Sequence, residues 1–184
     1  MIKSRITILL IGVVGVILCF SGCMTAISRD YYNELEDYET IWSLPGFRHG
    51  YEGVSEFFPQ SLDGLTVQDY LCRYDQFIPV GEGVQVYLEI LYEDENIFME
   101  EVERLSEMGF ECTEQFEGTG FLAYATRMGE SYDSEYALID EENNIIYYIY
   151  LSYLLKEDVA IDEQFIPRGY YDWGYVDMDL SETE

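Results

Sequence analysis

The sequence predicts an α+β domain: an antiparallel β-sheet with one main helix packed on a face, plus a short N-terminal helix. Three observations predict it. Residues 84–92 alternate apolar and polar side chains with the period of a strand. Residues 94–109 carry apolar side chains at helical spacing. The turns predicted at 117–120 and 141–143 are too short for parallel crossovers, so the strands that they join should be antiparallel.

The first element expected is a short amphipathic helix over residues 30–42. Asp30 is placed to cap its first turn, and Pro45-Gly46 should end it. The apolar side chains at helical spacing are Tyr31, Leu35, Tyr38 and Trp42. Residues 46–64 contain several turn residues and should form an irregular lead-in to the sheet.

Two strands should follow, at residues 65–77 and 84–92, with a turn between them around Pro79 and Gly83. In the second strand the side chains divide cleanly between two faces. One face should carry Val84, Val86, Leu88 and Ile90, and the other Gln85, Tyr87 and Glu89.

The main helix is predicted over residues 94–109. Asp94 can cap its first turn, and Gly109 should stop it, with Phe110 as the apolar residue that follows. Glu100 and Arg104 are spaced for an ion pair one turn apart. The buried stripe should consist of Phe98, Val102 and Leu105.

Four further strands are expected, at residues 110–116, 121–128, 135–140 and 144–155. The first two flank the turn 117–120, and the last two flank the turn 141–143. Residues 145–155 are almost wholly apolar and aromatic, which predicts a central strand buried on both faces. Residues 177–184 form an acidic tail.

The N-terminus has the organisation of a secretory signal. Lys3 and Arg5 precede an apolar run, and the small residues Ser21 and Gly22 lie directly before Cys23. The motif "FSGC" resembles the lipobox of bacterial lipoproteins. This resemblance implies that residues 1–22 are removed and that Cys23 becomes the lipidated first residue. Cys19 has no small residues before it.

An uncleaved membrane helix is the alternative, since residues 6–28 contain no charged side chain and a span needs about 20 residues. In either case Lys3 and Arg5 should stay in the cytoplasm, with the rest of the chain outside. The expected organisation is therefore a signal peptide (1–22), a tether (23–29), a lead-in (30–64), an α+β domain (65–176) and the tail (177–184).

A second resemblance concerns the mature part. The segments "FFPQSL" (57–62), "YEDENIFMEEVERLSEM" (92–108) and "IDEENNIIYYIY" (139–150) are similar to small lipoproteins of Gram-positive bacteria. The similarity covers roughly residues 55–153. That group has no assigned activity, so the resemblance implies no functional residue.

Charge excludes several classes of partner. The chain has 37 acidic and nine basic residues, for a net charge of −28. Removing residues 1–22 takes away Lys3 and Arg5 and no acidic residue, which changes the net charge to −30. Nucleic acid is not an expected partner, because phosphate binding needs clustered Lys and Arg. An anionic bilayer would repel this domain, so attachment should come from the lipid or the span.

Few residues point to catalysis or to metal binding. His49 is the only histidine and stands outside any catalytic or zinc motif. Cys72 and Cys112 are candidates for a disulfide, and buried free thiols are the alternative. A weak calcium candidate is the turn at Asp140, Glu141, Glu142 and Asn143, which lacks the glycine and the terminal Glu of an EF-hand loop. A solvated hairpin tip is the competing interpretation.

The aromatic stretch 165–175 is the best candidate for a binding surface, since Tyr, Trp and Arg dominate binding hot spots. Its candidate residues are Arg168, Tyr170, Tyr171 and Trp173. The alternative is an arm that packs its aromatic side chains over the sheet.

We therefore expect a lipid-anchored, extracytoplasmic protein that binds an envelope protein, a cationic peptide or a glycan, without enzymatic activity and without a cofactor. The alternative is a carboxylate-dependent hydrolase of envelope polymer. Two facing carboxylates with perturbed pKa values in a concave pocket would favour that alternative.

Overall fold

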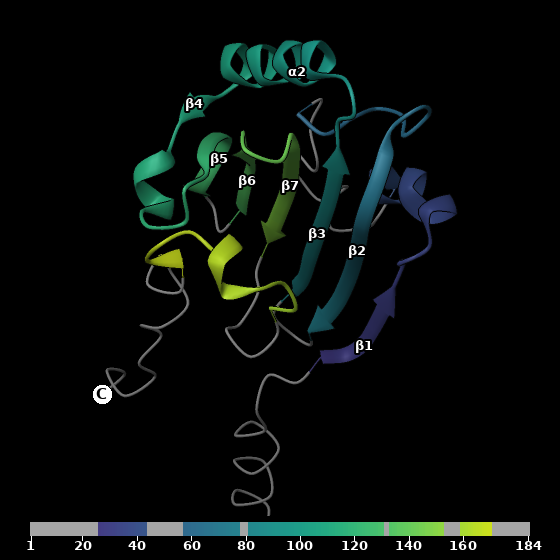
Figure 1. Cartoon of the computed structure of the whole chain (residues 1–184). Helices are drawn as coiled ribbons and strands as arrows, with labels where there is room; N and C mark the ends of the chain where they lie inside the picture. The colour runs from purple at the N-terminus through teal and green to yellow at the C-terminus, as the bar shows by residue number, and fades with distance from the viewer. Residues whose placement is uncertain (1–25, 44–56, 78–80, 131–132, 153–158, 171–184) are drawn as a thin grey trace, which may run out of the picture.

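Seven strands form one antiparallel sheet, in the order β1-β2-β3-β7-β6-β5-β4 (Figure 1). The computed structural model describes residues 26–43, 57–77, 81–130, 133–152 and 159–170. The strands are β1 (Ala26–Tyr31), β2 (Thr66–Phe77), β3 (Gly81–Leu91), β4 (Phe110–Glu111), β5 (Leu122–Glu130), β6 (Asp133–Asp140) and β7 (Ile145–Ser152). The helices are α2 (Glu95–Met108) and the 3-10 helices η1 (Leu35–Ser43), η3 (Thr113–Phe116) and η5 (Glu163–Phe165). The predicted α+β class is confirmed.

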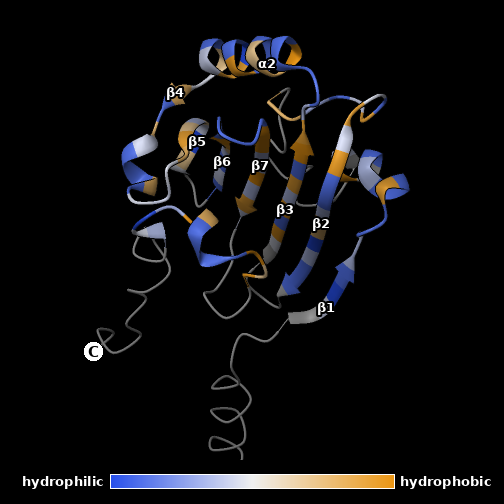
Figure 2. Cartoon of the chain, viewed as in Figure 1, coloured by the Kyte–Doolittle hydropathy of each residue, from blue (hydrophilic) through white to orange (hydrophobic). Residues whose placement is uncertain are grey.

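The middle position in the sheet belongs to β7, and this explains its composition. Every residue from Ile146 to Ser152 is buried. Alternate side chains point to opposite sides of the sheet, so a strand covered on both sides needs apolar residues at every position. The prediction of a central strand buried on both faces is confirmed. Figure 2 shows mostly apolar residues in β7 and mostly hydrophilic ones in β1, at the edge of the sheet.

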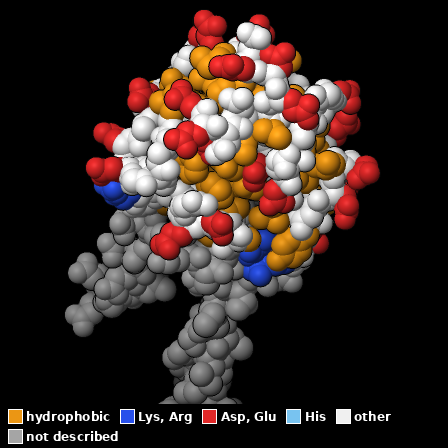
Figure 3. Space-filling model, viewed as in Figure 1, with side chains coloured by type: hydrophobic (Ala, Val, Ile, Leu, Met, Phe, Trp, Pro, Cys, Tyr) orange, Lys and Arg blue, Asp and Glu red, His pale blue; other side chains and the backbone are white. Residues whose placement is uncertain are grey.

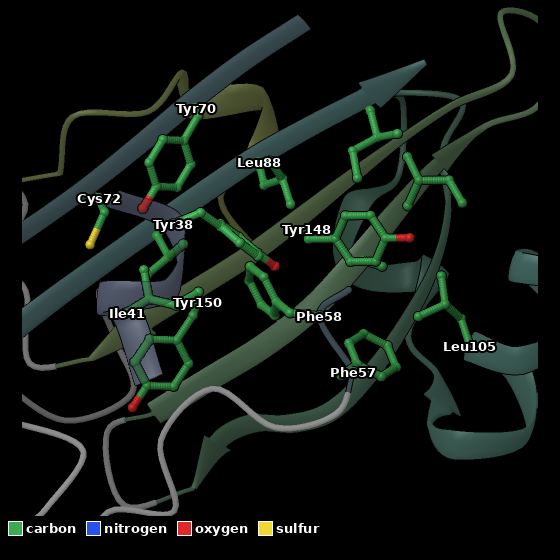
Figure 4. Close-up of a cluster of buried hydrophobic side chains, with 14 of the residues drawn as sticks. Tyr38, Ile41, Phe57, Phe58, Tyr70, Cys72, Leu88, Leu105, Tyr148 and Tyr150 are labelled. Carbon is green, nitrogen blue, oxygen red and sulfur yellow. The ribbon is translucent and has the colours of Figure 1, made fainter. Parts of the chain in front are cut away.

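One side of the sheet, called here the helix face, is covered by α2, η1 and the segment around Phe57 and Phe58. Figure 4 shows this cluster, in which Phe58 lies against Tyr148 with ring centroids 5.7 Å apart. Tyr38 of η1 donates a hydrogen bond to the carbonyl of Pro59 at 2.6 Å. As predicted, β3 turns one set of its side chains to this face: Val84, Val86, Leu88 and Ile90.

The other side, called the arm face, is covered by η3 and by residues 159–170, called the arm (the yellow segment in Figure 1). Two sets of polar contacts hold the arm on the sheet. Tyr136 Oη donates to the carbonyl of Phe165 at 2.7 Å. Gln85 Oε1 accepts from the backbone N–H groups of Ala160 and Ile161, at 2.8 and 3.2 Å.

Helix α2 follows the prediction closely. Asp94 accepts a hydrogen bond from the N–H of Asn96, and the buried residues are Phe98, Val102 and Leu105. Gly109 follows the last residue of the helix, and only glycine fits at this position, because a Cβ would lie 2.8 Å from the carbonyl oxygen of Ala125 in β5. The predicted Glu100–Arg104 pair is wrong, because Arg104 bonds Glu101 instead, at 2.6 Å. Arg104 turns inward to donate to the Phe57 carbonyl at 2.8 Å, and Glu101 lies on that inner side.

The N-terminal region differs from the prediction. Residues 26–31, expected as tether and as the first helical turn, form the edge strand β1. Asp30 pairs with Tyr74 of β2, so it lies in a strand and caps no helix. The helical segment is the 3-10 helix η1, which begins at Leu35 and buries Tyr38 and Ile41. Periodicity in one segment carries no information about a pairing strand that lies far along the chain.

Residues 110–116 also differ from the predicted strand. Only Phe110 and Glu111 pair with β5, and residues 113–116 form η3, which buries Phe116 against the arm face. The turn predicted at 117–120 is present, and Gly118 and Gly120 adopt positive φ angles of 94° and 86° there.

Candidate functional site

The arm face carries a cluster of aromatic rings that the arm completes. Tyr147 and Phe165 have ring centroids 4.8 Å apart, and Phe121 lies 5.4 Å from Tyr147. Phe121 also stacks on Phe165, at 6.0 Å. Phe165 and Ile166 are buried, whereas Phe121 is partly exposed. Of the predicted aromatic segment 165–175, the structure describes residues 165–170. Much of this described part packs on the sheet.

Beside this cluster lies a cavity of about 730 Å³, called here the arm pocket. It is lined by Thr113, Glu114, Gln115, Phe116, Glu117, Gly118, Gly120, Phe121 and Arg168. Three chain segments build it: η3, the glycine-containing turn after it, and the end of the arm. The N–H of Arg168 donates to the carbonyl of Gln115 at 2.9 Å and fixes the arm to η3.

Charged groups lie at the mouth of the arm pocket. Arg168 donates to Glu117 Oε2 at 2.9 Å, with both side chains well exposed. Glu114 is a second exposed carboxylate in the lining. An exposed pair of this kind adds little stability, so it can exchange partners with a ligand at low cost. An aromatic wall with ion-pairing groups at its mouth suits a polypeptide ligand.

The four candidate binding residues have different placements. Arg168 lines the arm pocket, and Tyr170 is half-buried against the arm-face cluster. Tyr171 and Trp173 lie outside the described residues. The structure thus brings Arg168 together with Phe121 and Glu117, which sequence reasoning did not select. The predicted turn at 117–120 was the one available signal for that part of the pocket.

A second cavity of about 760 Å³, called the α2 groove, lies between α2 and the segment that leads into β2. Its lining consists of Phe58, Pro59, Gln60, Leu65, Tyr92, Ile97, Glu100, Glu101, Arg104 and Met108. None of these residues is predicted from the sequence to bind a ligand. Ile97 and Met108 were available as a signal, because they are apolar residues that lie off the buried stripe of the helix.

Two buried charge clusters lie outside both cavities. On β2, Arg73 and Asp75 are buried and bonded to each other, and Arg29 of β1 also donates to Asp75 at 2.9 Å. On the helix face, Arg127 contacts Asp133 at 3.8 Å and Glu135 at 3.2 Å. Burial raises the pKa of Asp133. Since neither cluster lines a cavity described above, we assign both to the fold.

The candidate disulfide between Cys72 and Cys112 is not formed, and the alternative of two buried free thiols is the one that the structure shows. The physical reason is their position, because Cys72 belongs to the helix-face cluster and Cys112 to the arm-face cluster, on opposite sides of the sheet. Burial raises the pKa of each thiol to about 12, so at neutral pH both are uncharged thiols.

In the turn that was the weak calcium candidate, the carboxylate oxygens of Asp140 accept hydrogen bonds from within the turn itself. Asp140 Oδ1 accepts from the N–H groups of Glu142 and Asn143, and Asp140 Oδ2 accepts from the Asn143 amide at 2.8 Å. These bonds close the hairpin between β6 and β7. Within the described ranges, no group of three or more His, Cys, Asp or Glu residues is placed to hold a metal ion.

Several predicted residues lie outside the described part of the chain: Cys19, Cys23, His49 and the tail 177–184. Among the helices that the structure does describe, none is both long and apolar enough to cross a membrane. Comparison of the chain with models of known families, with curated proteins and with solved structures finds no match.

Proposed function

We propose that the protein is a bacterial lipoprotein, anchored outside the cytoplasmic membrane through Cys23, and that its domain binds cationic polypeptide segments without catalysing a reaction. The anchor rests on the basic start, the apolar run and the "FSGC" motif. Strand β1 begins at Ala26, three residues after Cys23. Three residues span at most roughly 10 Å, so a lipid on Cys23 would hold the sheet close to the bilayer.

The charge distribution carries the binding proposal. All five described arginines are bonded to carboxylates within the fold: Arg29, Arg73, Arg104, Arg127 and Arg168. With 37 acidic and nine basic residues, the chain cannot neutralise most of its carboxylates internally. Figure 3 shows carboxylates scattered over the whole visible surface. A cationic segment would be attracted to this surface at long range, whereas an anionic envelope polymer would be repelled.

The hydrolase alternative requires two facing carboxylates with perturbed pKa values in a pocket. In the described part of the chain, Asp133 is the carboxylate whose pKa is raised, and it lies outside both cavities. No observation therefore favours this alternative.

Anchoring can be tested by metabolic labelling with a fatty acid. Cys23→Ala should abolish incorporation of the label and release the protein from membranes, while Cys19→Ala should leave both unchanged. Equal labelling of the two variants would refute the assignment of Cys23.

Binding can be tested with the full-length protein in a non-ionic detergent. A fluorescent Lys-rich peptide should bind at low salt and be released as NaCl rises, and a Glu-rich peptide of equal length should not bind. Failure of the Lys-rich peptide to bind at low salt would refute the proposed ligand class.

A further inference from the structure

The α2 groove lies at the end of the sheet farthest from the start of β1. Its lining residues Leu65 and Tyr92 directly precede β2 and directly follow β3. Ala26 pairs with Phe77, at the opposite end of β2. The twelve residues of β2 separate the two ends by roughly 35 Å at about 3.3 Å per residue. A chain anchored at Cys23 would therefore hold the α2 groove away from the bilayer.

Exposed apolar side chains are concentrated at this end of the molecule. Six large apolar residues in the described part of the chain are exposed: Tyr31, Leu35, Ile97, Met99, Met108 and Phe110. Four of the six belong to α2 or to the residue two positions after it. Of these, Ile97 and Met108 line the α2 groove, with 53% and 40% of their surface exposed. Exposed apolar side chains at a concave site are typical of a binding surface.

A network of hydrogen bonds fixes the polar wall of the α2 groove. Glu101 accepts two bonds from Arg104, at 2.6 and 2.7 Å, and Arg104 also donates to the Phe57 carbonyl. Tyr148 Oη donates to Glu101 at 2.5 Å and lies 2.8 Å from Tyr92 Oη. A wall that is ordered before binding loses little entropy when a ligand arrives.

The charge of the lining indicates the kind of ligand. Its charged residues are Glu100, Glu101 and Arg104. Arg104 neutralises Glu101, so the exposed carboxylate of Glu100 gives the α2 groove a net negative charge. The remaining lining is largely apolar. A ligand that fits presents apolar side chains to Ile97 and Met108 and a basic side chain to Glu100.

We propose that the α2 groove is the docking site for a short amphipathic segment of a partner protein, with apolar side chains next to lysine or arginine. This inference rests on the proposed function and assigns that function to a site. It places the binding site in the α2 groove, at the end of the domain that faces away from the membrane anchor, and not in the arm pocket. The segment docks by burying apolar side chains on α2, in the manner of amphipathic peptides in apolar grooves.

The test uses the full-length protein in a non-ionic detergent and two fluorescent peptides. The first combines lysines with two leucines placed four residues apart, and the second replaces both leucines by serine. Three single variants are compared with the unmodified protein. Ile97→Asp and Glu100→Lys change the lining of the α2 groove. Glu103→Lys makes the same charge change on an exposed residue of α2 that does not line it. Thermal unfolding should first show that the variants fold.

We expect the Leu/Lys peptide to bind at least about tenfold more tightly than the Ser/Lys peptide, because the Ser/Lys peptide has no leucine side chains to bury in the α2 groove. Ile97→Asp and Glu100→Lys should each weaken the Leu/Lys peptide by about tenfold, and Glu103→Lys by no more than about twofold. Two results would refute the assignment of the α2 groove as the docking site: equal affinity of the two peptides, or equal effects of Glu100→Lys and Glu103→Lys. Either result would leave a diffuse acidic surface as the binding site.

Two further outcomes separate the proposals. If Phe121→Ala in the arm pocket abolishes binding while Ile97→Asp does not, the arm pocket is the docking site and the inference about the α2 groove is refuted. If neither peptide binds at low salt, both the α2 groove and the proposed ligand class are refuted.

Discussion

Tyr148 in the central strand donates a hydrogen bond of 2.5 Å to Glu101 of α2, from a position 47 residues further along the chain. Burial, together with the neighbouring Tyr92 hydroxyl and Glu101 carboxylate, raises the pKa of Tyr148 well above its usual value, so the hydroxyl keeps its proton. The same carboxylate holds Arg104, which bonds the Phe57 carbonyl. The Glu101 side chain thus joins α2 to the sheet through Tyr148, and to the segment before β2 through Arg104.

Removal of the Tyr148 hydroxyl should weaken the contacts that join the sheet, α2 and the segment before β2. Tyr148→Phe leaves Tyr92 Oη and Glu101 without one bond each, and an unsatisfied buried polar group costs about 1–3 kcal/mol. We expect the free energy of unfolding to fall by that amount in urea denaturation. Tyr31→Phe, at an exposed tyrosine of β1, is the control and should change stability by less than about 0.5 kcal/mol. A wild-type value for Tyr148→Phe would mean that the network carries no net energy.

Leu105 is fully buried beneath α2. Leu105→Ala should leave a cavity and lower the free energy of unfolding by about 2–5 kcal/mol. Met99→Ala, at an exposed position of the same helix, should cost less than about 0.5 kcal/mol. Similar values for the two variants would contradict the orientation of α2.

Asp133 should make the protein less stable as pH rises. Burial raises the pKa of this carboxyl in the folded state, so the folded protein binds the proton more tightly than the unfolded chain does. The unfavourable contribution is complete above the folded-state pKa and disappears as pH falls toward the unfolded value of about 3.9. Asp133→Asn should therefore gain stability relative to wild type as pH increases. Denaturation curves of both proteins between about pH 4 and 7 check this, and a difference that is constant with pH would contradict it.

The two buried thiols should be inert in the folded protein. Their pKa values of about 12 leave almost no thiolate at neutral pH, and the thiolate is the reactive form. Iodoacetamide should modify Cys72 and Cys112 only after denaturation, with no reductant needed, as mapped by mass spectrometry. A requirement for reductant would demonstrate a disulfide, and rapid labelling of the native protein would contradict the burial of the thiols.

Moderate salt should stabilise the domain. Folding brings the carboxylates closer together, and physiological salt screens exposed charges beyond about 8 Å. The thermal midpoint should rise as NaCl increases from low to physiological concentration, and a fall would mean that the carboxylates are largely compensated.

Calcium should act no more strongly than NaCl of equal ionic strength, because Asp140 already accepts bonds within its own turn. Stabilisation at micromolar calcium would instead indicate specific binding.

The elements predicted correctly are those whose signal is local. The stripe of Phe98, Val102 and Leu105 and the cap Asp94 are visible within one segment, as are the alternation of β3 and the apolar run of β7. Each depends on a periodicity that any buried helix or strand must satisfy. The location of the protein was likewise predicted from a local signal, at residues 1–23, and it stays a prediction.

The sequence by itself determined the α+β class, the main helix, the central strand and the excess of negative charge. Only the tertiary structure decided that residues 26–31 join the sheet, that Cys72 and Cys112 lie on opposite sides of it, and that Arg104 bonds Glu101 and Phe57. The two cavities also belong to this second group. The reason is physical: periodicity and turn chemistry act between near neighbours, whereas strand pairing and cavities depend on segments brought together from distant positions, such as Arg29 and Asp75, 46 residues apart.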